Sequence, residues 1–168
     1  NYKPLKVKNT LNFLKDFSRI KREDSSAKFI AVTGSAGKTS LKTMLGGLLN
    51  KYSKTYFSPL SYNNHYGVPL SLSNISPDHI FGVFEVGMSK FNEIFRLSSL
   101  VKPDIGIITN ISEAHLENFR NISDIAKAKG EIISNIQKGG TIILNRDDSF
   151  FNYFKRQAIK NEIQIKSF

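Results

Sequence analysis

Short apolar runs alternate along the chain with longer segments in which apolar residues repeat every three or four positions. The short runs are rich in aromatic and β-branched residues and have the length of buried strands. They cover residues 29–32, 54–57, 80–86, 105–109, 141–144 and 162–168. The longer segments have the period of amphipathic helices. The first two of these segments begin at residues 10 and 41. The others cover residues 90–101, 123–137 and 150–159.

The first two predicted helices have defined inward faces. In the first, Thr10 can serve as the N-cap. Its predicted inward residues are Leu11, Leu14 and Phe17, with Phe13 beside them. In the second helix, the predicted inward stripe consists of positions 41, 44, 45, 48, 49 and 52. Two polar stretches, 21–26 and 58–69, indicate a linker and a loop.

Strands that alternate with helices favour an α/β fold with a mostly parallel sheet. Because one strand leads into a phosphate-binding loop, we expect a P-loop-containing three-layer sandwich. Residues 1–26 are expected to form an N-terminal helix and linker, and residues 27–168 the domain itself. Ligands of such folds bind at the carboxyl ends of the strands. Polar residues at these ends are therefore the first candidates for a site.

A glycine-rich loop joins the strand at 29–32 to the helix that follows. Its residues are Gly34, Ser35, Ala36, Gly37, Lys38, Thr39 and Ser40. The glycines let the backbone turn tightly, so that N–H groups at the helix N-terminus can converge on an anion. Lys38 would add a positive charge at the terminal phosphates of a nucleotide, and the Thr39 hydroxyl could bind Mg²⁺. Since Val32 replaces the first glycine of the general pattern, a chance strand–turn–helix corner is the alternative interpretation.

The charge balance of the chain is strongly basic. Lysine and arginine number 24 against 14 aspartates and glutamates, which gives a formal net charge of +10. Such an excess suits a nucleic acid or a phosphorylated small molecule as a ligand. Because the basic residues are scattered along the sequence, most of them are interpreted as solvated surface. The chain has no cysteine, which excludes disulfides and thiolate chemistry and fits a reducing cytoplasm.

Three polar residues lie at or just after predicted strand ends. Glu85 interrupts the apolar run 80–86, where burial of a carboxylate is costly unless it is paired or bound to a cation. It is interpreted as a metal-binding acid beside the phosphate loop, with a capped or salt-bridged carboxylate as the alternative. Asn110 and His115 follow the strand at 105–109. His115 is a candidate ligand, and a structural or exposed histidine is an equal alternative.

A lysine lies on the apolar face of the helix predicted for 123–137. The apolar stripe of this helix consists of Ile125, Ala126, Ile132, Ile133 and Ile136. Helical spacing places Lys129 on the same stripe, whereas Lys127 points away from it. A lysine that faces inward needs a partner, a lowered pKa or a chemical modification. The alternative is a lysine whose ammonium extends from the helix edge to solvent.

Seven sequence blocks together resemble the central ATP-binding domain of the Mur ligases. They occur in the order of that family and cover most of the chain, from about Val7 to Asp148. The blocks are 33–40, 62–69, 85–89, 102–111, 114–119, 128–132 and 144–148. Blocks 62–69 and 85–89 are most similar to the branch of the family that adds the dipeptide D-Ala-D-Ala.

The resemblance implies an ATP-dependent amide ligase of peptidoglycan precursor synthesis. Members of the family use ATP to phosphorylate a carboxylate of a nucleotide-linked peptide, and an amine then attacks the acyl phosphate to give an amide, ADP and phosphate. The implied substrates are UDP-N-acetylmuramoyl-tripeptide and D-Ala-D-Ala. The implied protein is a cytoplasmic bacterial enzyme, expected to be a monomer.

The resemblance also implies roles for particular residues. Lys38 would hold the β- and γ-phosphates of ATP. Thr39 and Glu85 would bind one Mg²⁺, and His115 a second. Lys129 matches a lysine that this family carbamylates with CO₂, and its carbamate would support the second ion. The remaining matches are Asn64, with Asn63, near the transferred phosphate, and Asn110 in the nucleotide pocket.

Complete members of the family carry an N-terminal domain for the UDP-linked peptide and a C-terminal domain that closes over ATP. Neither is recognisable in this sequence, so we expect a truncated core that is not active alone. Two other interpretations are kept. One is a related ligase of the folylpolyglutamate or cyanophycin type, against which the paired asparagines at 63 and 64 argue. The other is a basic P-loop module that binds nucleic acid without catalysis.

Overall fold

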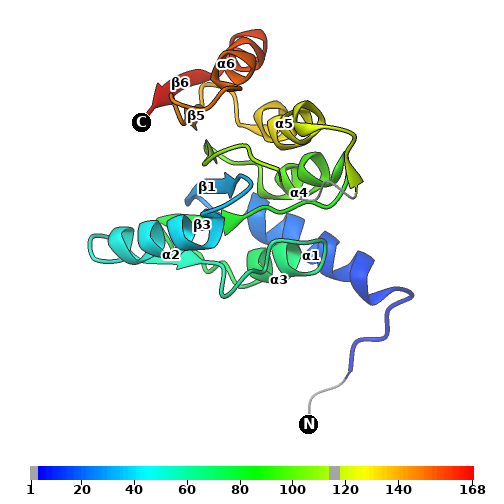
Figure 1. Ribbon diagram of the computed structural model, residues 1–168. Coiled ribbons are helices and arrows are strands. Elements are labelled where there is room, and N and C mark those ends of the chain that lie inside the picture. The colour runs from blue at the N-terminus through cyan, green and yellow to red at the C-terminus, as the bar shows by residue number, and fades with distance from the viewer. Residues whose placement is uncertain (1–3, 114–117) are drawn as a thin grey trace.

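The computed structural model describes residues 4–113 and 118–168, and its strands form one parallel sheet (Figure 1). The strands are β1 (Lys28–Thr33), β2 (Thr55–Phe57), β3 (Phe81–Glu85), β4 (Ile105–Ile108), β5 (Thr141–Leu144) and β6 (Gln164–Ser167). All pairs of neighbouring strands are parallel, in the spatial order β2-β3-β1-β4-β5-β6. The predicted α/β fold with a parallel sheet is therefore confirmed.

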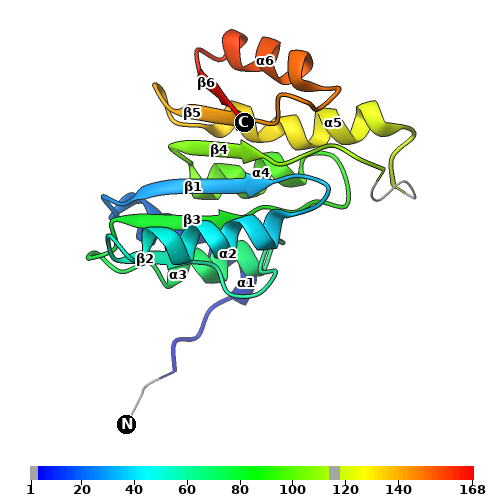
Figure 2. The same cartoon turned by 60° about the vertical axis from the view of Figure 1, so that its left-hand side comes forward.

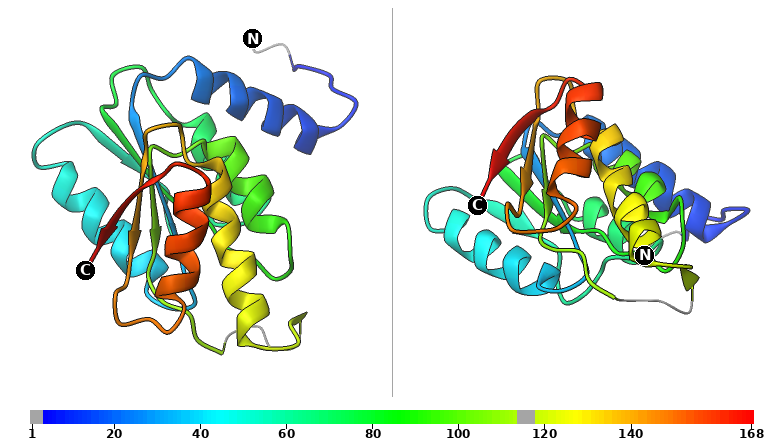
Figure 3. Two further views of the ribbon diagram at one scale, coloured as in Figure 1. Left: turned by 90° about the horizontal axis from the view of Figure 1, so that it is seen from above. Right: turned by 45° about the horizontal axis from the view of Figure 1, so that its top comes forward.

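Helices lie on both faces of this sheet. They are α1 (Thr10–Glu23), α2 (Lys38–Leu49), α3 (Gly67–Ser73), α4 (Glu93–Val101), α5 (Ile122–Gly130) and α6 (Phe151–Lys160), and the 3-10 helix η2 (Glu131–Asn135) continues α5. Figures 2 and 3 show α2 on one face and the other described helices on the opposite face, which makes three layers. None of the described helices is long and apolar enough to cross a membrane.

Two apolar cores hold these layers together. Under α2, buried residues of β1, β3 and β4 contact Leu41, Leu45 and Leu49. The core on the opposite face is larger and includes the parallel rings of Phe29 and Phe84, whose centroids are 5.5 Å apart. Successive residues of β1 point alternately into the two cores, and this explains why its sequence is apolar without interruption.

The predicted inward face of α2 was wrong in part. Met44, Leu48 and Tyr52 are exposed, although the apolar stripe had placed them inside. Leu41, Leu45 and Leu49 face the sheet, and Lys42 and Gly46 are the buried residues of this helix. The helix is therefore rotated so that an i, i+4 row of leucines, rather than the wider stripe, meets β1 and β3.

The predictions for α1 were also wrong in part. Asn9 rather than Thr10 is the N-cap, and its side chain accepts a hydrogen bond of 2.9 Å from the N–H of Asn12. Phe13 and Phe17 stack on each other at the surface instead of facing inward. The helix continues to residue 23, through part of the predicted linker, and its buried residues are Ser18 and Arg22.

Helix α3 was not predicted, because its sequence begins with the loop-like residues Gly67-Val-Pro69. Proline is compatible with the first turn of a helix, since the N–H groups there have no partner within the helix. The segment 58–69 is therefore a loop only up to Tyr66. The short helix that follows packs Val68 and Leu72 into the larger core.

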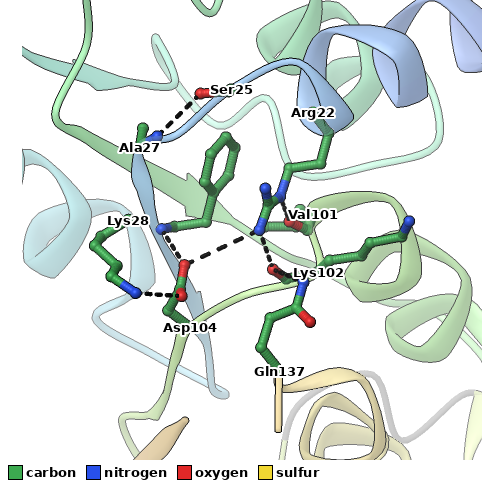
Figure 4. A network of polar contacts seen from close by, with 9 residues as sticks. Arg22, Ser25, Ala27, Lys28, Val101, Lys102, Asp104 and Gln137 are labelled. Atoms are coloured by element: carbon green, nitrogen blue, oxygen red, sulfur yellow. Dashed lines mark hydrogen bonds and ion pairs between the residues drawn. The ribbon is translucent and has the colours of Figure 1, made fainter. Parts of the chain in front are cut away.

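Arg22 anchors α1 at the amino ends of the strands, as Figure 4 shows. Its side chain donates hydrogen bonds of 2.7 Å to the carbonyl groups of Val101 and Lys102, at the end of α4. The guanidinium also lies 3.9 Å from the centre of the Phe29 ring. The Asp104 carboxylate, 4.0 Å from Arg22, accepts the backbone N–H of Phe29. One buried cation thus joins α1, α4 and β1.

We expect Arg22→Met to lower the free energy of unfolding by about 2–3 kcal/mol, because two backbone carbonyls lose a charged donor. Only the carbonyl of Lys102 keeps another donor, the Gln137 amide at 3.4 Å. Urea denaturation of the chain measures the change. The matched control is Arg19→Met, whose guanidinium pairs at the surface with Asp16, and it should change stability by less than about 0.5 kcal/mol. Equal effects of the two substitutions would contradict an anchoring role for Arg22.

Candidate active site

The loop between β1 and α2 has a backbone that only glycine permits at two positions. Gly34 has φ +148°, and a Cβ atom there would lie 1.8 Å from Oγ1 of Thr109. Gly37, the N-cap of α2, has φ +79° in the left-handed region. The two glycines of the sequence motif are therefore required, one by the close approach of Thr109, which follows β4, and one by the turn into the helix.

The tip of this loop is fixed by the residues that follow β4. The backbone N–H of Ser35 donates to the carbonyl of Asn110 at 2.9 Å, and the N–H of Ala36 donates to its Oδ1 at 3.0 Å. Thr109 donates its hydroxyl to the carbonyl of Ala36 at 2.6 Å. Asn110 thus holds the loop through its main chain and its side chain, and its predicted contact with a nucleotide stays a prediction.

The first turn of α2 presents unsatisfied N–H groups to the carboxyl edge of the sheet. Helix geometry leaves the N–H groups at 38–40 without intrahelical acceptors, and Gly37 offers no side chain to cap them. The Lys38 ammonium bonds to the carbonyls of Gly34 at 2.9 Å and Ser35 at 3.3 Å. The helix dipole, these N–H groups and the ammonium together form a site for an anion such as a phosphate.

Glu85 is buried next to this anion site. In the parallel register it stands beside Val32, at the end of β1, and it is 1% exposed. Its Oε2 accepts the Thr39 hydroxyl at 2.7 Å, and its Oε1 accepts the Asn63 amide at 2.7 Å. The structure therefore brings together Thr39 and Glu85, the two residues predicted to share a metal ion, and adds Asn63 on the opposite oxygen.

The donor set beside the loop fits Mg²⁺. Groups of three or more His, Asp or Glu side chains that could hold a metal ion are absent from residues 4–113 and 118–168. Mg²⁺ commonly takes only one or two protein oxygens and completes its shell with water and substrate phosphates. The Thr39 hydroxyl and the Glu85 carboxylate are two such oxygens, next to a phosphate site.

Lys129 is buried as its place on the apolar stripe of α5 predicted, with 2% of its surface exposed, and Lys127 points to solvent. Burial, and second the positive charge of Lys38, lower the pKa of Lys129 from 10.5 to about 7. Its ammonium has no hydrogen bond or ion pair with any residue that the structure describes. Lys129, Lys38, Asn63 and Asn64 line one cleft of about 860 Å³.

Two other residues were predicted to belong to the site, Asn64 and His115. Asn64 accepts the backbone N–H groups of Tyr66 at 3.1 Å and Gly67 at 2.9 Å with its side-chain oxygen, and so fixes the start of α3. Its amide group remains for a ligand in the cleft. His115 lies outside the described residues, so its predicted role as a ligand stays a prediction.

Sequence reasoning missed Lys42, which is 1% exposed. Its ammonium donates to the carbonyl of Leu60 and so ties the loop that carries Asn63 to α2. Burial lowers the pKa of Lys42, while the nearby Glu85 carboxylate opposes that shift. The available signal was its spacing from Gly46 and Leu49, which puts all three on the sheet-facing side of α2.

The comparisons with known proteins agree on one family. The model of the Mur ligase middle domain matches residues 32–168. The UDP-N-acetylmuramoyl-tripeptide–D-alanyl-D-alanine ligase of Rickettsia prowazekii is 41% identical over 146 residues, which are 87% of this chain and 32% of that protein. The chain thus spans about a third of the length of the curated relatives that it matches.

Solved structures show the same relationship. The UDP-N-acetylmuramoylalanyl-D-glutamyl-2,6-diaminopimelate–D-alanyl-D-alanyl ligase of Acinetobacter baumannii matches with a TM-score of 0.89 and 34% identity, over 98% of this chain and 36% of that one. The MurF ligase of Thermotoga maritima, solved in complex with ADP, matches with a TM-score of 0.83 and 27% identity, over 98% of this chain and 38% of that one.

We expect Lys129→Met to stabilise the chain in a pH-dependent way. The folded-state pKa of about 7 lies below the ordinary 10.5, so the folded state binds the Lys129 proton less strongly than the unfolded state. The resulting destabilisation is full below pH 7 and disappears as the pH rises toward 10.5. The gain from the substitution is therefore largest below pH 7, with an upper bound of about 5 kcal/mol.

Urea unfolding in CO₂-free buffer at about pH 6 and about pH 9.5 measures this gain. Lys127→Met, on the exposed side of the same helix, is the control and should show no comparable pH dependence. If the gain in stability from Lys129→Met were the same at both pH values, protonation of Lys129 would not be what destabilises the folded state.

Proposed function

Because the chain belongs to the Mur ligase family, we propose that it is the ATP-binding core of an enzyme that joins D-Ala-D-Ala to a UDP-N-acetylmuramoyl-tripeptide. Glu85, buried between the Thr39 hydroxyl and the Asn63 amide at the start of α2, carries this proposal. The names of relatives that match most of the chain support the choice of substrates. The activity is proposed for the protein at its natural full length, since the chain corresponds to about a third of those relatives.

The proposed reaction has two chemical steps. First, an oxygen of the peptide carboxylate forms a bond to the γ-phosphorus of ATP, the bond from that phosphorus to the β–γ bridging oxygen breaks, and ADP leaves. Second, the amine nitrogen of D-Ala-D-Ala attacks the carbonyl carbon of the acyl phosphate. The carbon–oxygen bond breaks, phosphate leaves with its electron pair, and the nitrogen loses a proton. The products are an amide, ADP and phosphate.

The first step brings an anion toward a polyanion, so positive charge must offset the repulsion. The loop supplies it in two forms. The N–H groups at 38–40 would hold the β- and γ-phosphates at the helix N-terminus, and the Lys38 ammonium would leave its present loop carbonyls for the phosphate oxygens. The contacts from Asn110 keep the loop in one conformation, so little ordering is needed when the nucleotide binds.

Thr39 and Glu85 would hold one Mg²⁺ through their neighbouring oxygens. The ion would neutralise charge on the transferred phosphoryl group and hold it in line with the attacking carboxylate. Asn63 keeps the Glu85 carboxylate oriented by binding its other oxygen. Asn64, on the wall of the same cleft, is proposed to contact the transferred phosphate with its amide.

We further propose that Lys129 carries a carbamate. Its neutral amine would form a nitrogen–carbon bond with CO₂ and release a proton. A pKa lowered to about 7 leaves much of the amine neutral at physiological pH, and the amine has no ion-pair partner among the described residues. The carbamate would place an oxygen anion in the cleft with Lys38. With His115 it would hold a second Mg²⁺, whose preferred ligands are such oxygens.

We propose a cytoplasmic, monomeric enzyme whose central ATP-binding domain is 27–168, preceded by the helix and linker at 1–26. The cleft lining includes Lys38 and residues that follow β3, at the carboxyl ends of the strands, where ligands of parallel α/β folds bind. Domains that complete the site for the nucleotide-linked peptide and the dipeptide would have to approach this edge.

We expect Lys38→Ala to weaken binding of ATP with Mg²⁺ at least about tenfold, because a charge-assisted contact to phosphate is lost. Thr39→Val, which keeps the side-chain shape, should remove the part of the affinity that depends on Mg²⁺. Calorimetric titration with ATP, with and without Mg²⁺, separates the two effects. Thr43→Val, an exposed change on the same helix, is the control.

Binding of ATP that is unchanged in Lys38→Ala would contradict the proposed nucleotide site. If instead the chain bound an oligonucleotide in a salt-sensitive way that survived Lys38→Ala, the nucleic-acid interpretation would be favoured.

The carbamate has its own test. With ¹³C-labelled bicarbonate, the protein should give a carbamate carbon signal in the NMR spectrum that is lost in Lys129→Met and kept in Lys127→Met. At natural full length, Lys129→Ala should reduce ligation at least about a hundredfold, because a metal-supporting anion is lost, while the fold stays intact. Full activity of that variant would show that the carbamate assignment is wrong.

A further inference from the structure

Lys42 is a buried cation to which the proposed reaction gives no role. Its side chain is 1% exposed and lies one turn of α2 beyond Lys38 and Thr39. Burial disfavours a charged ammonium unless oxygens or a negative charge surround it. Lys42 has both, because its ammonium donates to the carbonyl of Leu60 and the Glu85 carboxylate attracts it.

The carbonyl that Lys42 binds belongs to a strained turn at residues 59–62. Within this turn the N–H of Tyr62 donates to the carbonyl of Pro59 at 3.3 Å. Leu60 is the first central residue and has φ +45°, a conformation that favours glycine at this position. Its side chain is 74% exposed and gives the turn little packing. Leucine is tolerated in such a conformation when surrounding contacts hold it, and the Lys42 ammonium is one of them.

The same loop reaches the two residues proposed to bind Mg²⁺, and we call residues 58–63 the Leu60 loop. The Ser61 hydroxyl lies 3.4 Å from the Thr39 hydroxyl. The Asn63 amide donates to the Glu85 carboxylate at 2.7 Å. The carbonyl of Ser61 also accepts the N–H of Asn63 at 2.7 Å. The strained turn and the groups that contact Thr39 and Glu85 therefore move as one short loop.

The Leu60 loop is anchored on the sheet only near its ends. The N–H of Ser58 donates to the carbonyl of Val83 at 3.0 Å, and the N–H of Gly87 donates to the carbonyl of Asn63 at 2.8 Å. Between these ends the Lys42 ammonium ties the loop to α2 with a charge-assisted hydrogen bond, which is the stronger kind. The middle of the loop is thus held by a side chain of α2 rather than by the sheet.

We propose that Lys42 is a positioning residue for Mg²⁺, which holds the Leu60 loop in the conformation that lets Asn63 orient Glu85 toward Thr39. This rests on the proposed function, which assigns the ion to Thr39 and Glu85. Without the Lys42 contact the turn relaxes to a backbone that leucine prefers, and the Asn63 amide leaves the Glu85 carboxylate. Mg²⁺ then binds more weakly, because its ligands are no longer preorganised, while the N–H groups at 38–40 still hold phosphate.

The test titrates free Mg²⁺ in the ligation assay of the protein at its natural full length. We expect Lys42→Met, which keeps the length of the side chain and removes its donor, to raise the Mg²⁺ concentration for half-maximal rate about tenfold. The kcat at saturating Mg²⁺ should fall less than about threefold. A fraction of unfolded protein would instead lower kcat and leave the half-maximal concentration unchanged. Lys51→Met, an exposed change just after α2, is the control and should alter neither value.

A second variant tests whether Lys42 acts through the turn. Glycine adopts φ +45° without strain, so Leu60→Gly should let the turn form without the lysine. In the double variant of Lys42→Met and Leu60→Gly, the Mg²⁺ requirement should return to within about threefold of the wild-type value. A loss in Lys42→Met that the double variant does not reverse would overturn the proposal and assign Lys42 a direct electrostatic effect on Glu85. An unchanged Mg²⁺ requirement in Lys42→Met would overturn it as well.

Two further readouts do not depend on ligation. The N–H groups of Tyr62 and Asn63 are bonded within the Leu60 loop, and their hydrogen exchange should be at least about tenfold faster in Lys42→Met and slow again in the double variant. In calorimetric titration with ATP, Lys42→Met should weaken binding about tenfold with Mg²⁺ and less than about twofold without it.

These readouts separate the positioning role from the proposed function. If both differences appear but the wild-type protein joins no D-Ala-D-Ala to the nucleotide-linked peptide, the role of Lys42 is supported and the ligase function fails. Equal exchange rates at Tyr62 and Asn63 in the wild-type protein and in Lys42→Met would overturn the role of Lys42, whatever the activity.

Discussion

A carboxylate buried at the end of β3 determines how the carboxyl edge of the sheet is organised. An ionised Glu85 is tolerated there only if both of its oxygens are bound, since a buried charge without partners costs several kcal/mol. Thr39 supplies one donor and brings the start of α2 to the strand. Asn63 supplies the other and brings the loop before α3. One charge therefore fixes a helix terminus and a loop that are separate in the sequence.

The glycine-rich loop is held from the other side by the neighbouring strand. Asn110 accepts hydrogen bonds from two N–H groups of the loop, and the Thr109 hydroxyl donates one to a loop carbonyl. The N–H groups of the first turn of α2, in contrast, are left for an anion. Support on one side and unsatisfied donors on the other are what a rigid phosphate site needs, because the ordering of the loop is completed during folding rather than during binding.

Patterns in the sequence predicted the parts of the structure that depend on local spacing. The strands and Lys129 belong to this class, since an apolar run or a helical stripe defines burial directly. The faces of α1 and α2 and the existence of α3 depend on tertiary contacts. Arg22 anchors α1 through carbonyls of α4 that are 79 and 80 residues away, a contact that no local pattern contains. Lys42 was missed because the inward face predicted for α2 was rotated from the real one, so its spacing from Gly46 and Leu49 was not recognised as the sheet-facing side.

The fold also changes the meaning of the basic composition. Six of the 24 basic residues line one cleft. Apart from Lys38 and Lys129, nothing in the sequence indicated that they are anything other than solvated surface. Inside the cleft they repel each other. The pKa of Lys129 is lowered first by burial and second by the positive charge of Lys38. Each anion that enters, whether a phosphate, a carboxylate or a carbamate on Lys129, relieves part of this repulsion. The cations therefore offset the repulsion between negative reactants that must meet in one cleft, which is the electrostatic requirement of a reaction between a carboxylate and a polyphosphate.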